Sequence, residues 1–271
     1  MSEMGFRPDQ IDTANPHSSR MYNYYLGGWD NYEVDRRAAD RVLELAPSVR
    51  RTTVGYRAFQ RRAVRAVVAR GVRQILDIGT GIPLAPAVHE TARETAPETR
   101  VVYVDNDPIV STYAGAKLTN APGTAFVHAD LRDPEAILDH PATRELIDFD
   151  QPVAVLLVAV MHYVREPDDP EGILAAFTDR MADGSCLVQC HATADFDEDG
   201  SLLRAAKLYE QSTAQLVLRD RDSILPLFQG FELMEPGLVQ PPLWRPDGPP
   251  PGPEELRGHA GYAGVGVKGG V

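Results

Sequence analysis

The sequence is poor in cysteine and contains no long apolar run, and each shortage excludes a class of protein. Its two cysteines, Cys186 and Cys190, lie four residues apart, which fits neither a disulfide framework nor a Cys-x-x-Cys pair. No stretch reaches the roughly 18 apolar residues that a membrane helix needs, and the N-terminus has no apolar signal region. We therefore expect a cytoplasmic protein that does not interact with a membrane.

Lysine is also scarce, and acidic residues outnumber basic ones. The chain has 39 acidic and 27 basic residues, a formal net charge of −12, and no long basic run. Because duplex nucleic acid is bound through clustered positive charge, we expect no nucleic-acid partner and favour a small-molecule substrate. The 271 residues suit one elaborated domain, with a tail and helical cap over residues 1–70 and a core over 71–271. The oligomeric state stays open.

A short apolar strand that runs into a glycine turn is the strongest local signal. Residues 75–78 are apolar except for Asp77, and Gly79, Thr80 and Gly81 follow at once. Glycines lack the Cβ atoms that would keep a ligand off the backbone, and a helix expected over residues 84–95 would offer unpaired N–H groups. The pattern indicates a nucleotide-type ligand at the carboxyl end of a parallel strand. A plain strand-to-helix turn is the alternative.

The glycine spacing argues against one class of nucleotide. A dinucleotide fingerprint needs a third glycine where Leu84 stands, and Pro83 removes an N–H from the start of the helix. A pyrophosphate ligand, and with it a nicotinamide oxidoreductase, is therefore disfavoured. The alternative frame, Asp77-x-Gly79-x-Gly81, resembles motif I of the class I S-adenosylmethionine-dependent methyltransferases.

Acidic residues also end the next two expected strands. Asp105 and Asn106 follow one β-branched run, and Asp130 and Leu131 follow another. Because the carboxyl ends of parallel strands meet at one edge of a sheet, these side chains should gather around the glycine turn. A carboxylate at Asp105 can accept hydrogen bonds from both hydroxyls of a ribose.

Apolar strands alternate with amphipathic helices along most of the chain. Val153 to Val160 is apolar throughout, as a parallel strand covered on both faces must be, and a further strand is expected over residues 185–191. Helices are expected over residues 35–46, 56–70, 171–181 and 201–216. This alternation predicts an α/β fold with a mostly parallel sheet and helices on both faces.

Aromatic residues crowd a segment ahead of these elements. Four of the ten tyrosines and one of the two tryptophans lie within residues 15–32. This composition suits a lid over a flat, polar ligand, with Arg20, Tyr24 and Asn31 as candidate ligand-binding residues. An ordinary helix that uses its aromatic side chains as core is the alternative.

Two features suggest a metal site, but neither is complete. The run from Asp195 to Gly200 matches the start of a calcium loop, yet Ala206 stands where a bidentate glutamate is required. We expect this loop instead to cap the helix that follows it. His162 and His191 end two expected strands, but no third ligand has a recognisable spacing, so we expect no metal. Both histidines are candidate bases, or side chains with a purely structural hydrogen bond.

Four segments resemble those of a family of actinobacterial S-adenosyl methyltransferases. They are Ser18 to Asp35, Asp77 to Pro83, Tyr103 to Pro108 and Phe231 to Val239, so the resemblance covers nearly the whole chain. It implies a Rossmann-like, seven-stranded, mostly parallel sheet whose last strand, expected over residues 262–268, is reversed. It also implies S-adenosylmethionine as cofactor, but no particular methyl acceptor.

The resemblance implies roles for the strand-end residues. The backbone of residues 79–81 would hold the amino-acid and ribose parts of the cofactor, with Asp77 orienting the turn. Asp105, with Asn106 beside it, would take the ribose, and Asp130 with the Leu131 N–H would take the adenine edge. We interpret the protein as an S-adenosylmethionine-dependent methyltransferase, with a non-catalytic cofactor-binding sensor or partner subunit as the alternative.

Overall fold

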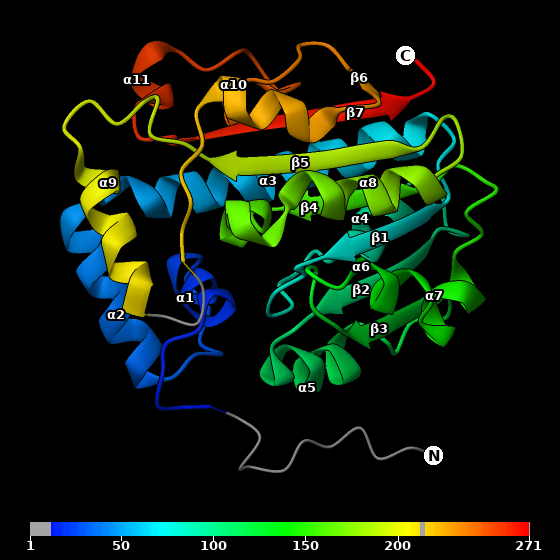
Figure 1. The fold of residues 1–271 in the computed structure, drawn as a ribbon, viewed down its shortest axis with the longest axis horizontal. Coiled ribbons are helices and arrows are strands. Elements are labelled where there is room, and N and C mark those ends of the chain that lie inside the picture. The colour runs from blue at the N-terminus through cyan, green and yellow to red at the C-terminus, as the bar shows by residue number, and fades with distance from the viewer. Residues whose placement is uncertain (1–11, 212–214, 271) are drawn as a thin grey trace.

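A seven-stranded sheet runs through the computed structural model, which describes residues 12–211 and 215–270 (Figure 1). Residues 1–11 of the expected tail lie outside this range. The strand order is β3-β2-β1-β4-β5-β7-β6. The strands are β1 (Gln74–Ile78), β2 (Arg100–Asp105), β3 (Thr124–His128), β4 (Ala154–Val158), β5 (Cys186–Ala192), β6 (Phe231–Leu233) and β7 (Gly261–Lys268).

The strand directions confirm the expected topology. β1 pairs in parallel with β2 and β4, β2 pairs in parallel with β3, and β4 pairs in parallel with β5. β7 runs antiparallel between β5 and β6, as expected for a reversed last strand. The carboxyl ends of the five parallel strands therefore lie at one edge of the sheet, where ligands bind in open α/β folds.

The sheet is covered on both faces, which explains why its central strands are apolar throughout. Along β4, Leu156 packs into one core and its neighbours Val155 and Leu157 pack into the other, because successive side chains of a strand point to opposite faces. One core includes Phe59 of α3, and the other includes Phe177 of α8. Each face of the sheet thus has its own helical layer, as the pattern predicted.

The helices of the described residues connect and cover the strands (Figure 1). They are α1 (Ser18–Tyr25), α2 (Glu33–Leu45), α3 (Ser48–Ala69), α4 (Val88–Arg93), α5 (Pro108–Lys117), α6 (Pro134–Leu138), α7 (Pro141–Leu146), α8 (Pro170–Arg180), α9 (Ser201–Ala206), α10 (Arg221–Ile224) and α11 (Pro253–Leu256). None of these helices is long and apolar enough to span a membrane.

A third core lies beyond the carboxyl edge of the sheet. Tyr25 of α1, Val42 of α2 and Leu202 of α9 are buried there together with Tyr209. Figure 1 shows α1, α2 and α9 grouped at the end to which the parallel strands point. The long helix α3 instead packs along the sheet. The helices α1, α2 and α9 therefore lie beyond the edge of the sheet at which the strand-end carboxylates gather.

Two expected helices are shorter than the sequence suggested. The helix expected over residues 84–95 begins only at Val88, because Pro83 and Pro86 lie in the segment that joins it to the glycine turn. Its N-terminus is therefore not at the turn. The helix expected over residues 201–216 ends at Ala206 and continues as a 3₁₀ turn, Lys207–Gln211. Residues 212–214 of that expectation lie outside the described residues.

Candidate functional site

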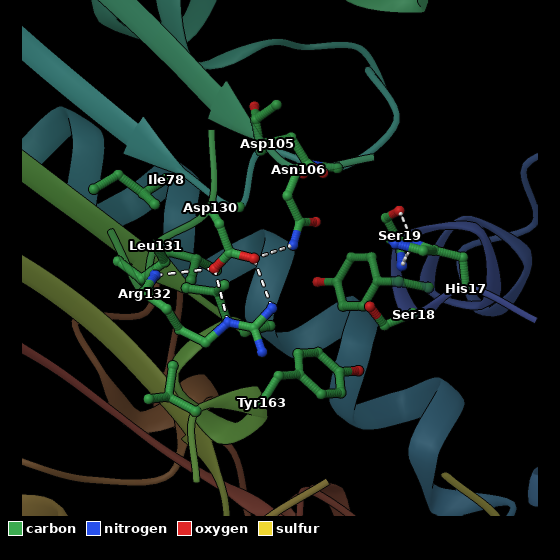
Figure 2. Close-up of a pocket in the computed structure, with 18 of the residues that line it drawn as sticks. His17, Ser18, Ser19, Ile78, Asp105, Asn106, Asp130, Leu131, Arg132 and Tyr163 are labelled. Atoms are coloured by element: carbon green, nitrogen blue, oxygen red, sulfur yellow. Dashed lines mark hydrogen bonds and ion pairs between the residues drawn. The ribbon is translucent and has the colours of Figure 1, made fainter. Parts of the chain in front are cut away.

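A cavity of about 420 Å³ lies at the carboxyl ends of β1, β2, β3 and β4. The helices α1 and α3 supply its far walls. Its lining includes His17, Ser18, Ser19, Tyr22, Arg57, Gln60, Gly79, Thr80, Gly81, Asp105, Asn106, Asp130, Leu131, Arg132, Val160, Tyr163 and Arg165. Figure 2 shows residues from the sheet edge facing residues of α1 across this space. A cavity of this size is typical of a small-molecule site.

The glycine turn forms one side of the cavity and is tied to the neighbouring strand. The N–H groups of Gly79 and Thr80 both donate to the Val104 carbonyl, at 2.9 and 3.1 Å. Gly79 and Gly81 have φ values of +72° and +66°, which favour glycine strongly. A Cβ atom on Gly79 would lie 2.7 Å from Val160, whereas one on Gly81 would meet no atom within 4 Å. The backbone at Gly81 is therefore open to a ligand.

Asp77 lies beneath this turn rather than in the cavity lining. Its Oδ2 accepts a hydrogen bond of 2.8 Å from the Thr80 hydroxyl, and the Gln60 amide lies 3.5 Å from its Oδ1. The residue is buried, and burial raises the pKa of its carboxyl to about 6. Asp77 is therefore placed to orient the turn through Thr80.

Asp105 ends β2 inside the cavity. Its Oδ2 accepts the Gly81 N–H at 2.8 Å and its Oδ1 accepts the Asp107 N–H at 3.0 Å. A carboxylate accepts about four hydrogen bonds, so roughly two positions remain for a ligand. Burial is the main reason that the pKa of Asp105 rises to about 7, and the nearby carboxylates of Asp107 and Asp77 add to it.

Asp130 lies two residues after β3 and is held by two neighbours (Figure 2). Arg132 donates from Nε to Oδ1 at 2.9 Å, from Nη2 to Oδ2 at 2.6 Å, and from its backbone N–H to Oδ1 at 2.9 Å. Asn106 donates from Nδ2 to Oδ2 at 2.9 Å. These hydrogen bonds, that of the Arg132 side chain above all, lower the pKa of Asp130 to about 2. The carboxylate stays ionised with its usual four acceptor positions filled.

Three residues expected to contact the ligand do not line the cavity. Arg20 is buried, with Nη1 3.4 Å from Asp35 and Nε 3.4 Å from Asp107. The Tyr24 hydroxyl donates to Asp40, and Asn31 donates to Asn23 and Gly28. We therefore leave Arg20, Tyr24 and Asn31 out of the proposed cofactor site.

The aromatic segment divides between the two expected roles. Tyr22 lines the cavity, as a lid residue would, whereas Tyr25 is buried in the third core. Trp29 is 93% exposed and neither covers the cavity nor packs. The helix α1 is joined to the segment after β2, because the Ser19 hydroxyl donates to Asp107 at 3.1 Å. It forms a wall of the site.

The candidate bases His162 and His191 are buried outside the cavity lining. The Ala192 N–H donates to His162 Nδ1 at 3.3 Å, and His191 Nε2 lies 2.9 Å from Nη1 of Arg219. Burial lowers the pKa of His191 to about 3 and that of His162 well below its usual value. Both side chains are held by structural hydrogen bonds, the alternative that the sequence left open.

His17 is the histidine that lines the cavity, and sequence reasoning missed it. Its Nδ1 lies 2.7 Å from the Ser19 hydroxyl and 3.2 Å from Asp107 Oδ2. Burial lowers the pKa of His17, and the Asp107 carboxylate opposes this. Its position as the N-cap of α1, directly before Ser18 and Ser19, is the signal that could have marked it.

The Asp195 to Gly200 loop has the capping role that we expected. The Asp197 carboxylate accepts the N–H groups of Leu202 and Leu203 at the start of α9. Among residues 12–211 and 215–270, no cluster of three or more His, Cys, Asp or Glu side chains is arranged to hold a metal ion.

The strand order, the reversed β7 and the cavity beside the glycine turn define a class I S-adenosylmethionine-dependent methyltransferase fold. The sequence model of a family described as S-adenosyl methyltransferase matches residues 4–269. The chain belongs to this S-adenosyl methyltransferase family. It is an S-adenosylmethionine-dependent methyltransferase, and S-adenosylmethionine is its cofactor.

Two solved structures are similar to the chain over nearly its full length. A Streptomyces avermitilis MA-4680 protein described as a DUF574 family member is 39% identical, with a TM-score of 0.91, and the match covers 95% of this chain and 99% of that one. A Thermobifida fusca YX protein described as a candidate methyltransferase is 37% identical, with a TM-score of 0.90, over 97% and 98% of the two chains. No curated protein matches the chain.

Proposed function

We propose that the protein transfers the methyl group of S-adenosylmethionine to a small-molecule acceptor, and that the cavity at the sheet edge holds the cofactor. The observation that carries this proposal is the environment of Asp105. Its carboxylate is anchored by the Gly81 and Asp107 N–H groups and keeps acceptor positions for two hydroxyls. A ribose is the part of the cofactor with two neighbouring hydroxyls.

The other parts of the cofactor follow from this anchor. The backbone of residues 79–81, open at Gly81, would hold the portion next to the ribose. Asn106 lies beside Asp105, and Asp130 with the Leu131 N–H would receive the adenine edge. When bound, the cofactor supplies a methyl group on a sulfonium. The carboxylates at this edge of the sheet also suit its positive charge.

The residues of this chain would act mainly by alignment and exclusion of water. α1 closes the side of the cavity opposite the sheet, with Tyr22 facing inward. Where an acceptor must lose a proton, the imidazole of His17 is placed to take it. Its lowered pKa keeps it neutral, and thus able to accept a proton, at pH 7.

The walls of the cavity support a small acceptor. The cavity lies between the sheet edge, α1 and α3, where Tyr22 and Tyr163 supply apolar ring surface. A net charge of −12 gives no general attraction for nucleic acid. We therefore expect the acceptor to enter the cavity whole rather than present a side chain or base from a macromolecule.

Two measurements test this function. Calorimetric titration should show binding of S-adenosylhomocysteine and no binding of NAD, and Asp105→Ala should weaken the former at least tenfold. Separately, conversion of S-adenosylmethionine to S-adenosylhomocysteine should be stimulated by the small-molecule fraction of a cell extract. Turnover that depends only on the macromolecular fraction would show that the acceptor assignment is wrong.

A further inference from the structure

Three arginines line the cavity, and two of them are neutralised within the chain. Arg132 is paired with Asp130, and Arg165 donates from Nη2 to Asp168 at 2.8 Å. Arg57, on α3, has no ion pair of this kind with any side chain of the described residues. Since the charges of Arg132 and Arg165 are already matched, Arg57 is the cation of this cavity that remains available to an anionic group of a ligand.

The guanidinium of Arg57 is held beside the glycine turn by neutral groups. Its Nη1 donates to Gln60 Oε1 at 2.6 Å, and its Nη2 donates to the Leu84 carbonyl at 3.0 Å. Gln60 in turn reaches Asp77, the residue before the turn, and Leu84 comes just after the turn. Contacts on both sides of the turn, through Gln60 and the Leu84 carbonyl, therefore hold Arg57 alongside it. A guanidinium has five N–H donors, so most remain for a ligand.

We propose that Arg57 binds the carboxylate of the amino-acid part of S-adenosylmethionine. The inference rests on the proposed function, in which Asp105 takes the ribose and Asp130 takes the adenine. With those ends fixed, the amino-acid part extends along the glycine turn, on the side of Arg57. Arg20, the residue that the sequence suggested for this carboxylate, is occupied by Asp35 and Asp107.

Gln60 is a positioning residue in this arrangement. Its side-chain oxygen accepts from Arg57 while its amide nitrogen points to Asp77 Oδ1 at 3.5 Å. The amide therefore stands between the cation and the buried carboxylate, and leaves the guanidinium for an external partner. The charge of Arg57 still favours the ionised form of Asp77. A planar, held guanidinium suits bidentate recognition of a carboxylate.

Comparison of two ligands tests the assignment. S-adenosylhomocysteine carries the amino-acid part, whereas 5′-methylthioadenosine has the same adenine, ribose and thioether without it. In calorimetric titrations, Arg57→Met should weaken the binding of S-adenosylhomocysteine by about 10- to 100-fold, the size expected for a lost charge-assisted contact. Its affinity for 5′-methylthioadenosine should change less than about twofold, because that ligand has no carboxylate. Arg57→Lys keeps the charge, so its affinity for S-adenosylhomocysteine should lie between those of Arg57→Met and the unaltered protein.

Arg61→Met is the matched control. Arg61 lies one turn further along α3, is exposed, and does not line the cavity, so its loss should change neither affinity. A second measurement uses the unaltered protein. Decarboxylated S-adenosylmethionine should bind it more weakly than S-adenosylmethionine does, and should lose nothing further in Arg57→Met, because the interaction is then already absent.

The outcomes separate the two proposals. Two results in Arg57→Met would show that Arg57 does not bind the carboxylate. One is an equal loss of affinity for S-adenosylhomocysteine and 5′-methylthioadenosine, and the other is an unchanged affinity for S-adenosylhomocysteine. Should Arg57→Met fail to fold, equal binding of decarboxylated and intact S-adenosylmethionine by the unaltered protein would still contradict the assignment. If the unaltered protein bound 5′-methylthioadenosine but Asp105→Ala bound it equally well, the ribose assignment would fail, whereas a selective loss of S-adenosylhomocysteine binding in Arg57→Met would still support the role of Arg57.

Discussion

The Gly81 N–H donates a 2.8 Å hydrogen bond to Oδ2 of Asp105 and so joins the glycine turn after β1 to the end of β2. This contact fixes the carboxylate against the turn with its remaining acceptor positions toward the cavity. It also favours the ionised form of a group whose pKa burial has raised to about 7. The protonation of Asp105 should therefore control cofactor binding near neutral pH.

Cofactor affinity should fall as the pH decreases below 7. Ribose hydroxyls bind the ionised carboxylate, so bound ligand lowers the pKa of Asp105 and a proton must be released when binding occurs below about pH 7. One unit below that pKa, affinity for S-adenosylhomocysteine should be about tenfold weaker. Titrations between pH 6 and 8, in buffers with different ionisation enthalpies, measure both the affinity and the released proton. Asp105→Asn should bind weakly at every pH, and a parallel pH dependence in this variant would exclude Asp105 as its source.

Alanine at the two glycines of the turn should have different effects. Both positions have positive φ, which costs a non-glycine residue about 1–2 kcal/mol. Gly79→Ala also places a Cβ 2.7 Å from Val160, and such overpacking costs about 1–3 kcal/mol more. The Cβ of Gly81→Ala meets no atom within 4 Å, so this variant should lose less unfolding free energy than Gly79→Ala does. It should still weaken S-adenosylhomocysteine binding.

Urea unfolding and ligand titration of the two glycine variants check this difference. The prediction fails if Gly81→Ala is the less stable of the two, or if it binds S-adenosylhomocysteine as tightly as the unaltered protein does.

The Arg132 side chain should compete with adenine for the carboxylate of Asp130. All four usual acceptor positions of Asp130 are filled, so an adenine amino group must displace a donor. Arg132→Ala should therefore tighten the binding of S-adenosylhomocysteine by up to about fivefold, since a partly exposed ion pair contributes only about 0–1 kcal/mol.

S-inosylhomocysteine, which lacks the amino group, is the control ligand for this prediction. Its affinity should be lower than that of S-adenosylhomocysteine and should gain nothing in Arg132→Ala. Equal gains for the two ligands would show that Arg132 obstructs the cavity in general and that Asp130 does not read the adenine edge.

Arg20 should stabilise the fold rather than the ligand. Its guanidinium is 2% exposed and lies 3.4 Å from both Asp35 and Asp107, so Arg20→Met would leave two buried carboxylates without their arginine partner. Breaking a buried pair in this way costs about 3–5 kcal/mol. Arg37→Met, which removes an exposed partner of Glu33 on α2, should cost less than about 1 kcal/mol. Chemical unfolding of both variants measures the contrast, and equal stability of Arg20→Met and the unaltered protein would return Arg20 to the ligand site.

Local sequence was sufficient for the sheet and for the part of the site that the strands carry. The alternation of apolar strands and helices predicted the α/β class, and β1, β4, β5 and β7 begin and end within two residues of their expected positions. Parallel strands bring their carboxyl ends to one edge, so Asp105, Asn106 and Asp130 were found from their place after a strand. Chain order alone determines that relationship, because each of these residues lies at the end of a strand or within two residues of it.

Residues on helices were harder to assign, because the side of a helix that faces a cavity depends on how the helix packs. The sequence assigned no arginine of α3 to the ligand site, yet Arg57 lines the cavity. The sequence suggested Arg20 as a ligand-binding donor, yet it lies between carboxylates from α2 and from the N-cap of α5. His17 faces the cavity, while His162 and His191 are buried away from its lining.

The amino-acid sequence by itself thus determined the strands, the glycine turn and the acidic residues that end the strands, because these depend on periodicity and on chain order. Tertiary structure decided which cations are free and which are paired. Arg20 and Arg57 are chemically alike and both lie on helices that precede the sheet. They differ because the packing of α1 places two buried carboxylates around Arg20, whereas the packing of α3 places two neutral acceptors beside Arg57.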